Sequence, residues 1–180
     1  MDPVNRKLRV ATAWLGGCSG CHMSLLDMDE RLLALAGRIE LMASPLTDLK
    51  DFPEADVTLV EGAVANEDHL AHIRHIRAHT KLLVSFGDCA VTGNVPAMRN
   101  AYGIEEVLNE AYQASSSVVK GVPAGNAVVP KLLGRVRPVH EVVPVDVFLP
   151  GCPPDADAIY ELLSALLDGR RPEMGGRRFG

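Results

Sequence analysis

The sequence predicts an α/β domain in which helices cover both faces of a parallel β-sheet. Short apolar runs alternate along the chain with longer segments whose apolar residues recur at helical spacing. Glycine and proline separate many of these segments, as they do at the ends of strands and helices. Strands joined by helical crossovers form parallel sheets, so this alternation indicates an α/β architecture.

Apolar runs with the length of buried strands occur at five places. The first spans residues 8–15 and is closed by Gly16 and Gly17. The others span residues 38–44, 55–62, 81–87 and 145–151. Five parallel strands favour the doubly wound, flavodoxin-like order 2-1-3-4-5, with strands numbered along the chain.

Helical periodicity links these strands. A helix of about four turns is expected from Leu25 to Gly37, because the sequence DMDER separates its apolar residues. Asn66 is a typical N-cap residue, and it begins a second helix over residues 66–79. A last helix is expected over residues 154–169, which end in glycine.

Residues 90–144 interrupt the alternation with a long irregular insertion before the last strand. A short helix is expected near residues 103–114, whereas the prolines between 123 and 144 exclude a long helix there. A loop of this length is functional or is covered by a partner. We therefore expect one domain over residues 1–169, followed by a basic, glycine-rich tail over residues 170–180.

Composition excludes several classes of protein. The chain has 180 residues, 47% of them hydrophobic, which suits one domain with a substantial core. Its net charge of −5 argues against nucleic acid or an anionic membrane as the main partner. No apolar run approaches the roughly 18 residues of a membrane span. The N-terminal sequence resembles no export signal, so we expect a cytoplasmic protein whose thiols stay reduced.

The four cysteines follow predicted strands. Cys18 and Cys21 follow the first strand, Cys89 the fourth and Cys152 the fifth. The carboxyl ends of parallel strands meet at one edge of a sheet, where ligands bind. One C-x2-C pair with two lone cysteines suits an iron–sulfur cubane better than zinc, which favours paired C-x2-C units.

Other interpretations of these cysteines stay open at this point. A thioredoxin-like redox pair would use Cys18 and Cys21 but would leave Cys89 and Cys152 without a role. A structural zinc site is a further alternative. Burial as small apolar side chains explains one cysteine better than four. A flavin site rests on the fold alone, because the sequence GGCSGC lacks a hydroxyl-rich phosphate loop.

Histidines recur at helical spacing within residues 66–79, namely His69, His72, His75 and His79. Pairs spaced by four residues can bind metal. Arginines interleave with these histidines, however, and no carboxylate is in register with them. A helix flank that faces solvent or a partner is therefore the favoured interpretation.

The sequences GGCSGCHMSLLDMDE, LVEGAV, SFGDCA and LPGCPPDADAI together resemble the small subunits of [NiFe] hydrogenases. The similarity covers essentially the whole chain and is greatest to the soluble, NAD(P)-reducing bidirectional group. The related subunit of respiratory complex I, a quinone reductase, carries adjacent cysteines at the first ligand position. The two residues between Cys18 and Cys21 favour the hydrogenase branch, and a complex I-like quinone oxidoreductase subunit remains an alternative.

This resemblance implies one proximal [4Fe–4S] cluster whose ligands are Cys18, Cys21, Cys89 and Cys152. It implies a large-subunit partner that bears the nickel–iron site, and diaphorase-type partners that carry further iron–sulfur clusters and FMN. The chain would transfer electrons within a hydrogen:NAD+ oxidoreductase and would be inactive alone. Many relatives continue into a domain with two more clusters, for which this sequence has no spare cysteine.

Glu61 ends the third predicted strand, so we expect it at the same edge as the cysteines. From the residues alone, a solvated glutamate at a strand end is the simpler interpretation. The resemblance implies instead that the segment EGA lies beside the proximal cluster, facing the nickel–iron partner. Glu61 is therefore a candidate catalytic residue, as a proton relay or a reserve ligand.

Overall fold

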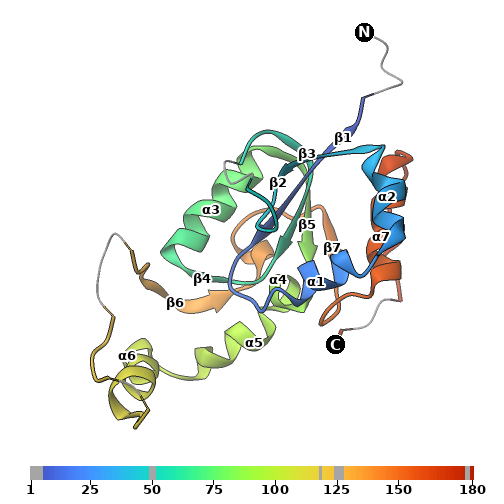
Figure 1. Ribbon diagram of the computed structural model, residues 1–180. Helices are drawn as coiled ribbons and strands as arrows, with labels where there is room; N and C mark the ends of the chain where they lie inside the picture. Colours follow the sequence, from blue (N-terminus) through green and yellow to red (C-terminus); the bar gives the residue numbers. More distant parts are fainter. Residues whose placement is uncertain (1–5, 49–51, 118, 124–127, 177–178) are drawn as a thin grey trace.

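The computed structural model describes residues 6–48, 52–117, 119–123, 128–176 and 179–180. Its centre is a parallel sheet of five strands in the order β2-β1-β3-β5-β7 (Figure 1). The strands are β1 (Leu8–Trp14), β2 (Ile39–Ala43), β3 (Ala55–Glu61), β5 (Thr80–Phe86) and β7 (Val147–Leu149). Numbered along the chain within this sheet, the order is 2-1-3-4-5, so the predicted flavodoxin-like arrangement is confirmed.

Helices cover both faces of this sheet (Figure 1). On one face, α7 (Ala156–Leu167) packs with Phe86 and Leu149 of the sheet in the larger apolar core. On the other face, Ile73 and Ile76 of helix α3 lie in a second core with the buried side chains of β3 and β5. The sheet is therefore buried on both sides, as its nearly continuous apolar strands predicted.

The ends of α3 (Glu67–Ala78) and α7 agree with the predicted helix boundaries. The side chain of Asn66 accepts a hydrogen bond from the His69 N–H at 2.8 Å. Asp155 caps α7 in the same way, because its carboxylate accepts from the Ala158 N–H at 2.7 Å. Both side chains satisfy a backbone donor that has no partner in the first turn of a helix.

The prediction of one helix from Leu25 to Gly37 is wrong. Two short helices occupy this part of the chain, α1 (Gly20–Leu26) and α2 (Glu30–Ala36). Asp29 separates them with a φ of 49°, outside the right-handed helical region. The break turns Met28 into the core, where its side chain is 1% exposed. Burial of this side chain offsets the cost of ending one helix and starting another.

The insertion before β7 is more ordered than its sequence predicted. The expected short helix is present as α6 (Ile104–Asn109), which continues into the π-helical η3 (Glu110–Ala114). A strand that was not predicted, β6 (Leu132–Arg137), pairs antiparallel with β4 (Val64–Asn66). The other elements between β5 and β7 are α4 (Asp88–Thr92), α5 (Asn94–Ala97), η2 (Met98–Ala101) and η4 (Val139–Glu141).

Strand β6 depends on contacts that local sequence does not reveal. The side chain of Asn100 in η2 donates to the Val136 carbonyl at 2.9 Å and accepts from the Val136 N–H at 2.8 Å. Arg99 donates to the carbonyls of Ala65 and Leu133, at 2.9 Å in each case. These side chains bond to backbone groups that a further strand would otherwise bond, namely those of Ala65, Leu133 and Val136.

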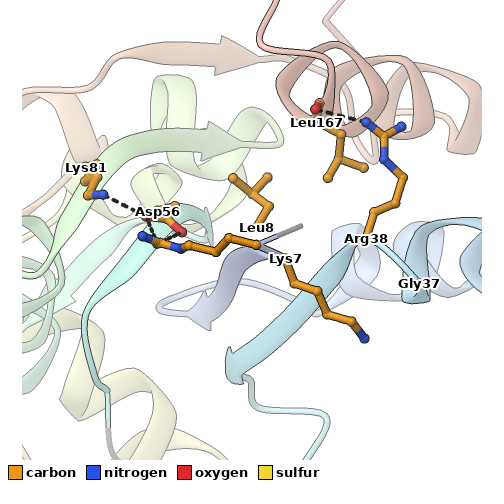
Figure 2. A pocket seen from close by; sticks show the side chains of 8 residues that line it. Lys7, Leu8, Gly37, Arg38, Asp56, Lys81 and Leu167 are labelled. Atoms are coloured by element: carbon orange, nitrogen blue, oxygen red, sulfur yellow. Dashed lines mark hydrogen bonds and ion pairs between the residues drawn. The ribbon is translucent and has the colours of Figure 1, made fainter. Parts of the chain in front are cut away.

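At the amino ends of the strands, Asp56 accepts bonds from three cationic residues. Arg6 Nη2 lies 2.6 Å from its carboxylate and Lys81 Nζ lies 2.9 Å from it, as Figure 2 shows for Lys81. The Arg9 N–H also donates to this carboxylate at 3.0 Å. Burial raises the pKa of Asp56, but the hydrogen bonds from Arg9, Lys81 and Arg6 together hold that pKa well below its usual range. Asp56 therefore links the starts of β1, β3 and β5.

None of the helices in the described part of the chain combines the length and the apolar character needed to cross a membrane.

Candidate metal centre

The structure brings all four cysteines together at the carboxyl edge of the sheet. Cys18 lies between β1 and α1, Cys21 lies in the first turn of α1, Cys89 lies in α4, and Cys152 follows β7. All four line one small cavity of about 50 Å³. The parallel sheet thus brings to one place thiols that lie far apart in the sequence.

None of these thiols forms a disulfide within the described residues. Burial, followed by the charge of Glu61, raises the pKa of Cys21 far above its usual value. Burial, followed by the neighbouring Cys152, also raises the pKa of Cys89. Thiolates at these positions therefore need positive charge beside them, which metal ions supply. The donor set and the cavity that it lines fit an iron–sulfur cluster with one thiolate at each corner.

Two glycines shape the loops that carry the cysteines. Gly87 follows β5 with a φ of 82°, and a Cβ there would collide with the Cys21 sulfur. Gly151 precedes Cys152 with a φ of 134°, and a Cβ there would lie 2.5 Å from the Pro154 Cα. Both positions require a backbone conformation that favours glycine and space that only glycine leaves free.

Glu61 lies at the end of β3 and lines the same cavity. Its side chain is 1% exposed, so the interpretation as a solvated glutamate is wrong. One oxygen, Oε2, accepts from the His22 N–H at 3.0 Å and lies 2.5 Å from His22 Nδ1. The other oxygen, Oε1, has no hydrogen-bond partner among the described residues. A buried carboxylate oxygen without a partner costs free energy, which a bound group in the cavity would offset.

Two residues of this site were not singled out in the sequence, His22 and Asp88. His22 is 1% exposed, and its Nε2 also has no partner within the described part of the chain. Asp88 is 3% exposed and lines the cysteine cavity. Each lies next to a cysteine in the sequence, which was the only signal available before the fold was known.

None of the four histidines in and just after α3 lines the cysteine cavity. His72 and His75 are exposed, and the rings of His75 and His79 lie 4.2 Å apart, measured between their centroids. His69 is half-buried, and its Nδ1 accepts from the Ala65 N–H at 3.3 Å. No three His, Cys, Asp or Glu side chains in the described residues are arranged to hold a single metal ion. Most of this helix flank faces solvent, as the interleaved arginines indicated.

Exposed apolar residues surround the edge that carries the thiols. Cys18, Cys89 and Cys152 also line an adjoining hollow of about 390 Å³, together with Val95 and Pro96. Val95 is 61% exposed. Further large apolar side chains at or next to this edge are also exposed, namely Trp14, Met23 and Met98. Exposed apolar patches of this kind mark surfaces where other proteins bind.

Comparison with known proteins gives consistent results. The family model described as NADH ubiquinone oxidoreductase, 20 Kd subunit, matches residues 18–166. The chain is 46% identical to the NAD-reducing hydrogenase HoxS subunit delta of Cupriavidus necator, over 94% of this chain and 86% of that protein. It is 38% identical to a subunit of the F420-non-reducing hydrogenase of Methanothermobacter marburgensis, over 93% of this chain. The chain spans only 56% of the length of that second relative.

Solved structures extend this result. A chain in the crystal structure of an NAD+-reducing [NiFe]-hydrogenase in the H2-reduced state superposes with a TM-score of 0.93 and 44% identity. The match covers 97% of this chain and 100% of that one. A [NiFeSe]-hydrogenase chain from Dm. baculatum, at 19% identity and a TM-score of 0.58, shares the fold. These relatives confirm the resemblance to hydrogenase small subunits, and the chain belongs to the NADH ubiquinone oxidoreductase 20 Kd subunit family.

Proposed function

We propose that this chain is the electron-transfer small subunit of a cytoplasmic, NAD(P)-linked [NiFe] hydrogenase. The observation that carries the proposal is the convergence of Cys18, Cys21, Cys89 and Cys152 on one cavity at the carboxyl edge of the sheet. The 46% identity to a subunit of an NAD-reducing hydrogenase supports the same assignment. The four thiolates would hold one [4Fe–4S] cluster.

A cluster at this position supplies reversible one-electron chemistry. Electrons would pass through it between a nickel–iron site on a large subunit and diaphorase-type subunits that carry further iron–sulfur clusters and FMN. The residues of this chain hold and shield the cluster. Cys21, Glu61 and Asp88 are buried on the inner side of the cavity, where a low local dielectric constant strengthens the electrostatic effect of each nearby charge.

Glu61 is the residue of this chain that we propose as catalytic. Its support is the burial of the side chain and the unpartnered Oε1 at the cavity that the thiols line. A carboxylate in this place could relay a proton to or from the partner surface while the cluster gains or loses an electron, or could serve as a reserve oxygen ligand. His22 holds the other oxygen, so the side chain has one fixed orientation.

The exposed apolar side chains at the carboxyl edge of the sheet suit a surface that binds partner subunits. We propose an obligate heteromer whose interfaces bury more than about 2,000 Å², as permanent complexes do. The exposed Trp14, Val95 and Met98 support contact with the large subunit at this edge. The cytoplasmic location and the division into a domain over residues 1–169 and a tail over residues 170–180 remain part of the same proposal.

The metal content of the chain tests the proposal directly. After anaerobic reconstitution with iron and sulfide, the chain should bind about four irons and four sulfides and give the low-temperature EPR signal of a reduced cubane. Stoichiometric zinc without sulfide would refute the proposal and favour a structural zinc site. Hydrogen oxidation by the purified complex, without a quinone, separates the hydrogenase assignment from a complex I-like quinone oxidoreductase.

A further inference from the structure

We infer that Asp88 is a positioning residue that fastens the Gly151–Cys152 loop and residues 179–180 to each other at the edge of the cysteine cavity. The inference rests on the proposed function, because the loop that Asp88 holds carries one of the four thiols. It assigns a task to a buried carboxylate that the proposed electron transfer does not use. It also assigns a task to the end of the segment that the sequence predicted to be a basic, glycine-rich tail.

The two oxygens of Asp88 bind two different segments of the chain. Asp88 Oδ1 accepts from the Gly151 N–H at 2.7 Å. Asp88 Oδ2 accepts from the Gly180 N–H at 2.7 Å. The Asp88 N–H in turn donates to the Gly151 carbonyl at 2.9 Å. Three hydrogen bonds therefore join the segment that contains Cys89 to the segment that contains Cys152 and to residue 180.

The approach of residue 180 to Cys152 is too close for a side chain. A Cβ built on Gly180 would lie 2.5 Å from the Cys152 Cβ and 2.7 Å from the Cys152 nitrogen. Real Cβ atoms do not approach other heavy atoms so closely, so residue 180 lies directly against the Cys152 backbone. The chain end marked C in Figure 1 accordingly lies at the end of the sheet that carries Cys152 and Asp88.

A carboxylate is the side chain that this arrangement needs. Asp88 is 3% exposed, and burying a carboxylate is costly unless hydrogen bonds satisfy its oxygens. Two backbone N–H groups from separate segments meet that requirement only while both segments stay in place. Both bonds are to the same buried carboxylate, and losing either one costs free energy. Movement of residues 179–180 is therefore coupled to movement of the Cys152 loop.

This coupling has a consequence for the cavity. The Cys152 side chain is itself exposed, so the loop on which it lies borders solvent. Residue 180 covers the backbone of that loop, and Asp88 prevents the loop from moving away from Cys89. We therefore expect Asp88 to slow the loss of iron from the cluster at the corner that Cys152 holds.

The test uses the full chain reconstituted anaerobically with iron and sulfide. Asp88→Asn keeps the size of the side chain but presents an amide N–H to one of the two backbone donors, so one bond is lost. Gly180→Ala leaves Asp88 intact and displaces residue 180 from Cys152. Asp146→Asn is the matched control, because Asp146 also accepts a backbone N–H, that of Leu83 at 2.7 Å, but lies at the amino end of β7.

Iron release to a chelator and the EPR spectrum of the reduced cluster are the measurements. Asp88→Asn and Gly180→Ala should each release iron about tenfold faster than the unchanged chain, the factor that corresponds to about 1.4 kcal/mol. Both should also alter the EPR line shape. Asp146→Asn should change neither. If Asp88→Asn does not fold, Gly180→Ala still tests the inference.

Release at the unchanged rate from either Asp88→Asn or Gly180→Ala would overturn the inference, as would equally fast release from Asp146→Asn. An unchanged chain that takes up no iron and sulfide is a different result. That result would refute the proposed function rather than the role of Asp88 within it.

Discussion

Glu61 accepts a hydrogen bond from the backbone of His22 through Oε2, while its Oε1 remains without a partner among the described residues at the cysteine cavity. Both side chains are 1% exposed. The pairing fixes a carboxylate beside the proposed cluster, and it joins the end of β3 to the helix that carries Cys21. The first prediction concerns this carboxylate.

Glu61→Gln keeps the size of the side chain and its bond to the His22 N–H but removes the acid–base group. We expect the complex to assemble with a normal cluster and to turn over H2 at least about tenfold more slowly, since general acid–base groups contribute factors of this order or more. Steady-state H2 oxidation over a range of pH and EPR after oxidation are the measurements. Glu40→Gln on the exposed part of β2 is the control. Unchanged kinetics, pH profile and EPR would leave Glu61 with a purely structural role.

Cys89→Ser and Cys152→Ser test whether all four thiols act together. Each variant should lose the intact cubane and with it electron transfer from H2, because each thiolate holds one corner. Iron and sulfide analysis, visible absorption and electron transfer to an artificial acceptor report the loss. A thioredoxin-like protein would depend on Cys18 and Cys21 alone, so thiol–disulfide activity that survives both substitutions would contradict the cluster.

A charge placed among the exposed apolar side chains at the carboxyl edge of the sheet should weaken binding of the large subunit. Val95→Asp places a carboxylate on a side chain that is 61% exposed next to the cysteine loops. We expect assembly of the complex to weaken at least about tenfold, because a buried unpaired charge is costly in an interface. Co-purification of the subunits and H2 oxidation measure the effect. Leu33→Asp, on a side chain of α2 that is 77% exposed, should leave assembly unchanged. A monomeric chain that oxidises H2 without partners would contradict the proposed heteromer.

Asp56→Asn tests the ionic cluster at the opposite end of the sheet. Removing the charge leaves Arg9 and Lys81 without their shared partner, so we expect the free energy of unfolding to fall by about 1–3 kcal/mol at pH 7. Urea denaturation of the dilute chain measures the change. Asp157→Asn is the control, because its ion pair with Arg31 is on the surface and the Asp157 side chain is 80% exposed.

The effect of Asp56→Asn on the free energy of unfolding should depend on pH. The pKa of Asp56 is lower in the folded protein than in the unfolded chain, where it is about 3.9. Its contribution is therefore fully present above about pH 4 and is lost as the pH falls toward the folded-state pKa. The difference in stability between the unchanged chain and Asp56→Asn should shrink below about pH 4. A constant difference down to about pH 3 would show that Asp56 is not held ionised by its neighbours.

Local sequence was enough to predict the sheet order, the helices α3 and α7, and the cysteines that gather at one edge. These features follow from the length of apolar runs, from side-chain caps such as Asn66, and from the rule that parallel strands end on the same side. The break at Asp29 and the strand β6 could not be predicted in this way. Met28 is turned inward by the core, and β6 is held by Asn100 and β4.

The sequence by itself determined where the four thiols lie, because residues that follow parallel strands meet at the carboxyl edge of the sheet. The tertiary structure alone decided how the neighbours of those thiols are used. From the residues alone, Glu61 was expected to be a solvated glutamate at a strand end. It is buried because His22 of α1 lies against its side chain. Asp88 and Gly180 lie 92 positions apart, and their bond exists because the chain returns to the edge that carries the cysteines. Contacts between residues so far apart in the sequence depend on the packing of the whole chain, and local sequence patterns do not predict them.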